Sequence, residues 1–95
     1  MEFKKYLQTS CFKVMDIKIQ NIEVLEDKIL KIFFSNNIVK NFDCKKVMDR
    51  ENYYTLKNEA FFNSVKIDKS RRFIYWNDEI DISENELWTK GVLIN

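Results

Sequence analysis

Five acidic residues near one end of the sequence are the side chains with the clearest chemical potential: Asp78, Glu79, Asp81, Glu84 and Glu86. Carboxylates that converge on one point can hold Mg²⁺ or Ca²⁺ through oxygen ligands, but this spacing lacks the glycine that a calcium-binding loop needs. The alternative interpretation is an acidic loop followed by the first turn of a helix, where acidic residues suit the helix dipole. We favour the second interpretation, and we predict no metal site and no cofactor.

The composition also argues against the common kinds of catalysis. The chain has no histidine, so neither a Ser-His nor a Cys-His nucleophile pair can be built. Its one glycine cannot supply a G-x-G-x-x-G or G-x-x-x-x-G-K phosphate-binding loop. The sequence therefore predicts a protein that is not an enzyme.

Basic residues around a predicted turn suggest nucleic-acid binding as one alternative. Phe73 and Tyr75 could stack on bases while neighbouring basic side chains contact phosphates, namely Lys66, Lys69, Arg71 and Arg72. However, acidic residues follow at once along the chain and would repel phosphates. The formal net charge is only +1, whereas nucleic-acid-binding domains usually carry a clear basic excess.

The same region is better suited to binding another protein. Aromatic side chains are enriched at the centres of protein interfaces, and an acidic rim would complement a basic partner and speed its encounter. The predicted partner-binding residues are Phe73, Tyr75, Asp78, Glu79, Asp81 and Trp88. For the three aromatic residues of this set, a place in the protein core is an equal alternative. A homodimer formed through the same face is a further option.

The length and composition indicate one small globular domain. The chain has 95 residues, of which 45% are hydrophobic and 15% aromatic, which favours a packed core over disorder. It contains no apolar run of about 18 residues that would span a membrane, and its start lacks the apolar stretch of a secretory signal. Cys11 and Cys44 stand alone, so we expect reduced thiols and a cytoplasmic location.

The first residues form a separate unit in this interpretation. Residues 1–13 are predicted to be an N-terminal extension, and residues 14–95 a single α+β domain. A helix over residues 2–12 would carry four apolar residues on one side: Phe3, Tyr6, Leu7 and Cys11. Such a helix would either dock on a partner or pack on its own domain.

Alternating apolar and polar residues predict the strands. The first follows Val14, and its alternation changes phase between Ile19 and Ile22, which predicts a bulge or a bend. Further strands are expected at 29–34, 38–43, 65–67 and 72–76, with turns at 26–28, 35–37 and 68–71. Apolar residues three and four apart predict short helical turns within 44–64.

The last predicted element is a helix. Ser83 and Glu86 form an S-x-x-E capping box at its start, and Gly91 would end it. Strands followed by helices indicate the α+β class, here a small antiparallel sheet of about five strands with short helices on one face. The run from Phe73 to Trp76 is apolar on both sides, so its second face is either covered by another segment or exposed to a partner.

Several weak signals in this order resemble the small bacterial proteins catalogued as domain of unknown function 2442. The similar segments are IEVLEDKILKIFFSNNIVKNFD, LKNEAFFNSVKID and FIYWNDEIDISENELW, within roughly residues 14 to 90. The matching positions are Phe34, Asp43, Leu56, Phe61, Phe62, Val65, Ile67, Asp68, Trp76, Asp81 and the Leu87–Trp88 pair. Asn37 stands in place of the usual turn glycine, Asn77 in place of a proline, and Trp88 in place of a tyrosine.

The resemblance implies an α+β domain without known catalytic residues. Family members look like companions in toxin–antitoxin-like gene pairs or are fused to helix-turn-helix domains. Together with the predicted partner-binding residues, the resemblance predicts a small non-enzymatic module that inhibits a basic or nucleic-acid-handling partner by occlusion. Antitoxins and phage-encoded anti-defence proteins such as an anti-CRISPR act in this way. The alternative is a nucleic-acid-binding regulatory domain.

Overall fold

The strands within residues 17–94 form two antiparallel sheets. The computed structural model describes residues 17–94, so the helix predicted over 2–12 lies outside the described residues. The four-stranded sheet has the order β2-β3-β4-β8, with β2 (Ile19–Val24), β3 (Ile29–Phe34), β4 (Val39–Asp43) and β8 (Val92–Leu93). The three-stranded sheet has the order β5-β6-β7, with β5 (Lys66–Ile67), β6 (Phe73–Asn77) and β7 (Ile80–Ser83).

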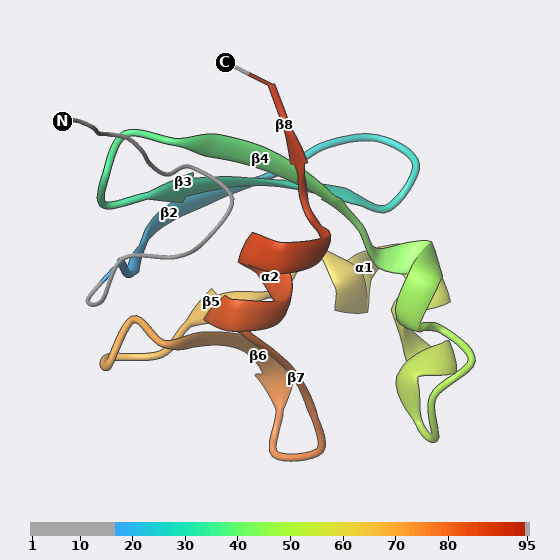
Figure 1. The fold of residues 1–95 in the computed structure, drawn as a ribbon. Helices are drawn as coiled ribbons and strands as arrows, with labels where there is room; N and C mark the ends of the chain where they lie inside the picture. The colour runs from blue at the N-terminus through green and yellow to red at the C-terminus, as the bar shows by residue number, and fades with distance from the viewer. Residues whose placement is uncertain (1–16, 95) are drawn as a thin grey trace, which may run out of the picture.

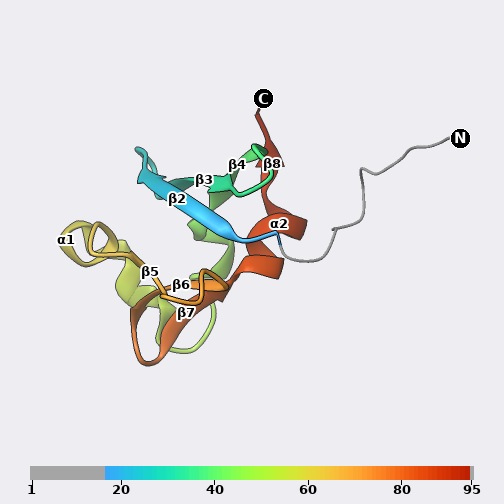
Figure 2. The same cartoon turned by 90° about the vertical axis from the view of Figure 1, so that its left-hand side faces the viewer.

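Short helices connect and separate the two sheets. Between β4 and β5 lie two 3₁₀ helices, η1 (Cys44–Val47) and η2 (Tyr53–Lys57), and the single-turn helix α1 (Glu59–Phe62). Helix α2 (Glu84–Lys90) follows β7 and lies between the levels of the two sheets (Figure 1). Figure 2 shows α1 and α2 on opposite sides of the molecule. The predicted α+β class is confirmed, although the strands divide between two sheets instead of forming one.

Both sheets direct alternate side chains into one hydrophobic core. From β3 the core receives Leu30, Ile32 and Phe34, and from β6 it receives Ile74 and Trp76. Trp76 is fixed by a 2.9 Å hydrogen bond that its indole N–H donates to the carbonyl of Phe62. The rings of these two residues stack with centroids 6.0 Å apart. A buried tryptophan whose polar N–H is satisfied in this way adds apolar area without an unpaired donor.

Several local predictions from the sequence are confirmed. The register of β2 against β3 shifts between Ile19 and Asn21, where the alternation changes phase. Asn37 has φ 72° in the β3–β4 turn, a conformation that asparagine tolerates. The Ser83 hydroxyl accepts the N–H of Glu86 at 3.1 Å and so caps α2.

One strand contradicts the sequence-based prediction. The sequence predicts an acidic loop at Asp78, Glu79 and Asp81, but β7 pairs with β6 in a hairpin. The Asn77 side chain makes the turn, because its Oδ1 accepts the N–H groups of Glu79 and Ile80, each at 2.9 Å. Ile80 and Ile82 are buried, so the alternation around Asp81 is that of a half-buried strand.

Helix α2 ends at Gly91, as predicted, but for a different physical reason. Gly91 has φ −73°, so no left-handed conformation requires glycine there. A Cβ atom at this position would lie 2.5 Å from the carbonyl oxygen of Leu87 and 3.1 Å from the Cβ of Lys40. Lys40 passes across this point to donate to the Trp88 carbonyl at 2.6 Å, with its ammonium 4.0 Å from the centre of the Trp88 ring. Burial lowers the pKa of Lys40.

We predict that Gly91→Ala lowers the free energy of unfolding by about 1–3 kcal/mol, because the added methyl group overpacks the contact with Lys40 and the end of α2. Urea denaturation measures the change. Asn85→Ala, on the exposed side of the same helix, is the matched control and should stay within about 0.5 kcal/mol of the parent protein. Equal stability of the two variants would contradict the close approach at Gly91.

Candidate functional site

The outer face of the three-stranded sheet carries two aromatic side chains. Along β6, Ile74 and Trp76 are buried, while Phe73 and Tyr75 alternate with them and are half-buried on the opposite face. The rings of Phe73 and Tyr75 lie 6.0 Å apart between centroids, at an angle of 54°.

Acidic residues border the aromatic pair and make a hollow. Asp81 on β7 lies directly opposite Tyr75, and Lys66 on β5 lies opposite Tyr75 on its other side. The turns at the two ends of β6 supply the remaining carboxylates. Together these residues line a hollow of about 380 Å³, which we call the aromatic–acidic surface: Asp68, Phe73, Tyr75, Asn77, Asp78 and Asp81.

Lys66 is a positive charge on the same face, but two of the three carboxylates of this surface have no described ion pair. Among the described residues, no lysine or arginine makes an ion pair with Asp78 or Asp81. Asp68 accepts the N–H of Ser70 at 2.9 Å. That hydrogen bond, with the nearby charge of Lys69, holds the pKa of Asp68 below its usual value. The surface therefore presents three carboxylates around two aromatic rings.

Two residues predicted for this surface lie elsewhere. Glu79 faces the connecting helices, where its Oε1 accepts the side-chain N–H of Asn52 at 3.2 Å. Trp88 is only 7% exposed and packs edge-on against Phe34, with centroids 5.0 Å apart. The prediction that Trp88 contacts a partner is wrong, because α2 turns this side chain into the space between the sheets.

The four basic residues predicted as a nucleic-acid contact are not free to act as one group. The Arg71 Nη1 donates to the main-chain carbonyls of Ile19 at 3.3 Å and of Gln20 at 2.8 Å, and so ties the β5–β6 turn to β2. Arg72 makes an ion pair with the buried Glu84 at 3.8 Å. Lys66 donates to the carbonyl of Ser64 at 3.4 Å, and Lys69 is exposed.

Sequence reasoning missed Asp68 and Asn77 as members of the surface. Both were visible as turn-forming residues, since aspartate and asparagine accept main-chain N–H groups two residues later. The N–H of Asp68 donates to the carbonyl of Phe73 at 3.0 Å, which brings the carboxylate beside the aromatic pair. The alternation of Ile80 and Ile82 indicates the β6–β7 hairpin. That hairpin places Asn77 on the aromatic–acidic surface as well.

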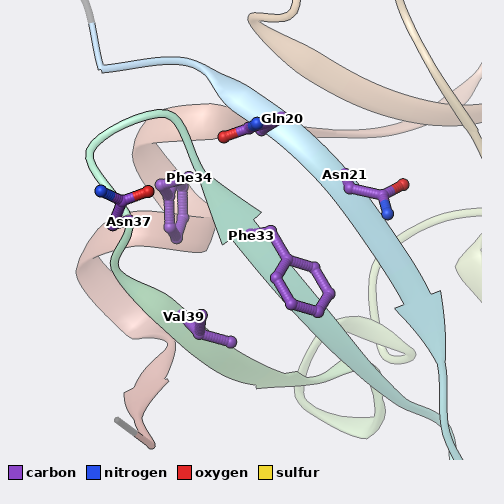
Figure 3. Close-up of a pocket in the computed structure, with 6 residues that line it drawn as sticks. All are labelled: Gln20, Asn21, Phe33, Phe34, Asn37 and Val39. Carbon is purple, nitrogen blue, oxygen red and sulfur yellow. The ribbon is translucent and has the colours of Figure 1, made fainter.

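The outer face of the four-stranded sheet holds a second, smaller hollow of about 300 Å³. Figure 3 shows Phe33 and Val39 side by side on β3 and β4, with Asn21 on the other side of Phe33. The remaining lining residues are Gln20, Phe34 and Asn37. Amides and hydrocarbon groups line this hollow, so it has no titratable side chain that could act as an acid or base.

The described residues offer little for metal or thiol chemistry. Within residues 17–94, no three His, Cys, Asp or Glu side chains are arranged to hold a metal ion. Cys44 is a buried free cysteine whose pKa is raised to about 12 by burial and by the nearby charge of Asp43. A buried thiol of this kind is unreactive. In the same range, the structure contains no helix with the length and apolar character to cross a membrane.

These features define a small two-sheet α+β protein with an acidic, aromatic outer face. A family model described as "Protein of unknown function (DUF2442)" matches residues 19–92. The chain therefore belongs to this family, and the resemblance found in the sequence is confirmed. No curated protein and no solved structure matches the chain.

We predict that Arg71→Gln lowers the free energy of unfolding by about 1–2 kcal/mol, because two carbonyl groups of β2 lose a charged donor. Chemical denaturation measures the loss. Lys69→Gln removes a positive charge from the same turn without breaking a described side-chain hydrogen bond or ion pair, so its effect should stay within about 0.5 kcal/mol. If both variants were equally stable, Arg71 would be available to an external ligand.

Proposed function

We propose that this protein binds a basic protein through the aromatic–acidic surface and inhibits it by occlusion. The observation that carries the proposal is the hollow in which Phe73 and Tyr75 are bordered by the carboxylates of Asp68, Asp78 and Asp81. A nuclease or another nucleic-acid-handling protein, whose working surface is basic, is the partner class that fits this charge. Occlusion requires no catalytic group, which agrees with a chain that lacks histidine.

The chemistry of the surface supports a cationic contact. A lysine or arginine of the partner could lie against the Tyr75 ring, where cation–π attraction adds to the charge of the carboxylates. Arginine suits the site best, because its planar guanidinium stacks on rings and pairs with carboxylates through two hydrogen bonds. Half-buried aromatic residues at the centre and charged residues at the rim are also the usual arrangement of an interface hot spot.

A nucleic-acid-binding regulatory domain is the alternative function. It would use Lys66, Lys69, Arg71 and Arg72, but the internal contacts of the two arginines leave mainly the lysines for phosphates. A homodimer through the aromatic–acidic surface would bring the carboxylates of two copies together, so repulsion disfavours it. We also propose a cytoplasmic location, supported by the free, buried thiol of Cys44.

The test of partner class is a pull-down from the native host with three baits: the parent protein, Asp78→Lys/Asp81→Lys, and Lys66→Glu/Lys69→Glu. We expect a basic protein to be retained by the parent and by the lysine variant, to be lost with the aspartate variant, and to resist nuclease treatment. The retained protein should lose activity when the parent protein is added in equimolar amount. Nuclease-sensitive retention, or loss with the lysine variant alone, would support nucleic-acid binding instead.

We predict that Tyr75→Ala weakens the complex by about tenfold or more, since a hot-spot side chain contributes about 2 kcal/mol or more and about 1.4 kcal/mol is tenfold in affinity. Isothermal titration calorimetry with the purified partner measures the affinity. Tyr54→Ala is the matched control, because Tyr54 is 63% exposed and lies outside the aromatic–acidic surface. A similar affinity for both variants would remove Tyr75 from the interface, and a collapse of the melting temperature would assign it to the core.

A further inference from the structure

The outermost strands of the two sheets are protected to different degrees. On β7, the Tyr53 hydroxyl donates to the carbonyl of Asp81 at 2.7 Å and accepts its N–H at 3.3 Å. On β2, Arg71 occupies two carbonyl groups. Strand β8 ends the order of the four-stranded sheet, and no described strand lies beyond it. Natural edge strands usually carry a charge, a proline or a cover. Val92, Leu93 and Ile94 contain no charge and no proline, and all three are exposed.

The pairing of β8 with β4 fixes the direction of its main-chain groups. The N–H of Ile94 donates to the carbonyl of Val39 at 3.1 Å, and Leu93 lies opposite Lys40. Along a strand, the N–H and C=O groups of successive residues point to opposite sides. The N–H and C=O of Leu93 therefore both point away from β4, and they offer one donor and one acceptor at the open edge.

The side chains at this edge are apolar and exposed. Val92 is 60% exposed, Leu93 55% and Ile94 44%. Val39 lies opposite Phe33 (Figure 3) and its carbonyl accepts the N–H of Ile94, so the outer face carries a row from Phe33 through Val39 to Ile94. This apolar row reaches the open edge of the sheet.

We propose that two copies of the chain pair along β8 in antiparallel orientation, with Leu93 on the two-fold axis. Each Leu93 then donates its N–H to the carbonyl of the other Leu93, which satisfies all four outward groups. This register sets Val92 of one copy opposite Ile94 of the other, so the two apolar rows meet across the axis. The same patch serves both copies, as a two-fold interface requires.

The charges of this face permit a second copy. In the neighbouring row, Glu23 lies opposite Lys31, so one acid and one base lie side by side within each copy. Such a face does not repel its own duplicate, whereas the aromatic–acidic surface does. The pairing joins two four-stranded sheets into one continuous sheet. Because β8 and the three-stranded sheet lie on opposite sides of the molecule, both aromatic–acidic surfaces stay open (Figure 1).

Disulfide trapping tests the register directly. The variants Leu93→Cys and Val92→Cys are compared in the full chain carrying Cys11→Ser, with the buried Cys44 retained. A hydrogen-bonded pair on the axis separates the two Cα atoms by about 5.5 Å, within the range of about 4.4–6.8 Å that a disulfide allows. The two Val92 residues would be diagonal neighbours about 7–8 Å apart. We expect Leu93→Cys to form the covalent dimer at least about tenfold faster on mild oxidation.

The two positions are almost equally exposed, so random collision would cross-link them at similar rates. Similar rates, faster trapping at position 92, or no trapping at either position would each overturn the proposal. Sedimentation of the parent chain supplies a second measurement, and a monomer at every concentration would also overturn it. Leu93→Pro should abolish the dimer, because it removes the outward N–H while the Ile94 bond to β4 remains. Leu93→Ala keeps that N–H and should still dimerise. A proline variant that remains dimeric would contradict the proposed pairing along β8.

Discussion

One hydrophobic core shared by two sheets is the constraint on which the rest of the structure depends. The four-stranded and the three-stranded sheet both turn alternate side chains toward the same cluster, and α2 fills the space between them with Leu87 and Trp88. A short chain has little material for a further layer, because small domains bury a smaller fraction of their surface. The outer faces of both sheets therefore keep half-buried aromatic residues, Phe33 on one and Phe73 with Tyr75 on the other.

The same constraint separates the charges of a nearly neutral chain. The arginines of the β5–β6 turn are exposed but make contacts within the chain, because Arg71 bonds to β2 and Arg72 pairs with Glu84, so their positive charge serves the fold. The carboxylates of Asp78 and Asp81 remain on the outside of the three-stranded sheet. A formal net charge of +1 therefore conceals a locally acidic face. Local fields, more than net charge, determine which partners approach a surface.

Local features of the fold could be predicted from the sequence, and contacts between distant segments could not. The bulge after Ile19 and the cap at Ser83 follow from alternation and side-chain chemistry within a few residues. Strand β7 was missed because the acids around Ile80 were interpreted as a loop, although their spacing also fits a strand. The burial of Trp88 depends on how α2 meets Phe34, and the contact of Arg71 depends on a carbonyl far away in the chain. Periodicity carries no information about either.

The hydrogen bonds of Tyr53 to the main chain of Asp81 have a thermodynamic consequence for the proposed binding of a partner. Strand β6 holds Asp81 on one side and the Tyr53 hydroxyl holds it on the other, so its backbone is fixed before any encounter. In the proposed complex, a carboxylate on a fixed backbone would lose less conformational entropy when it meets a cation than a carboxylate on a mobile loop. In the proposed complex, a rigid backbone would leave a larger share of the contact energy as affinity than a mobile acidic loop would. The affinity would also fall sharply for a partner whose cation is displaced.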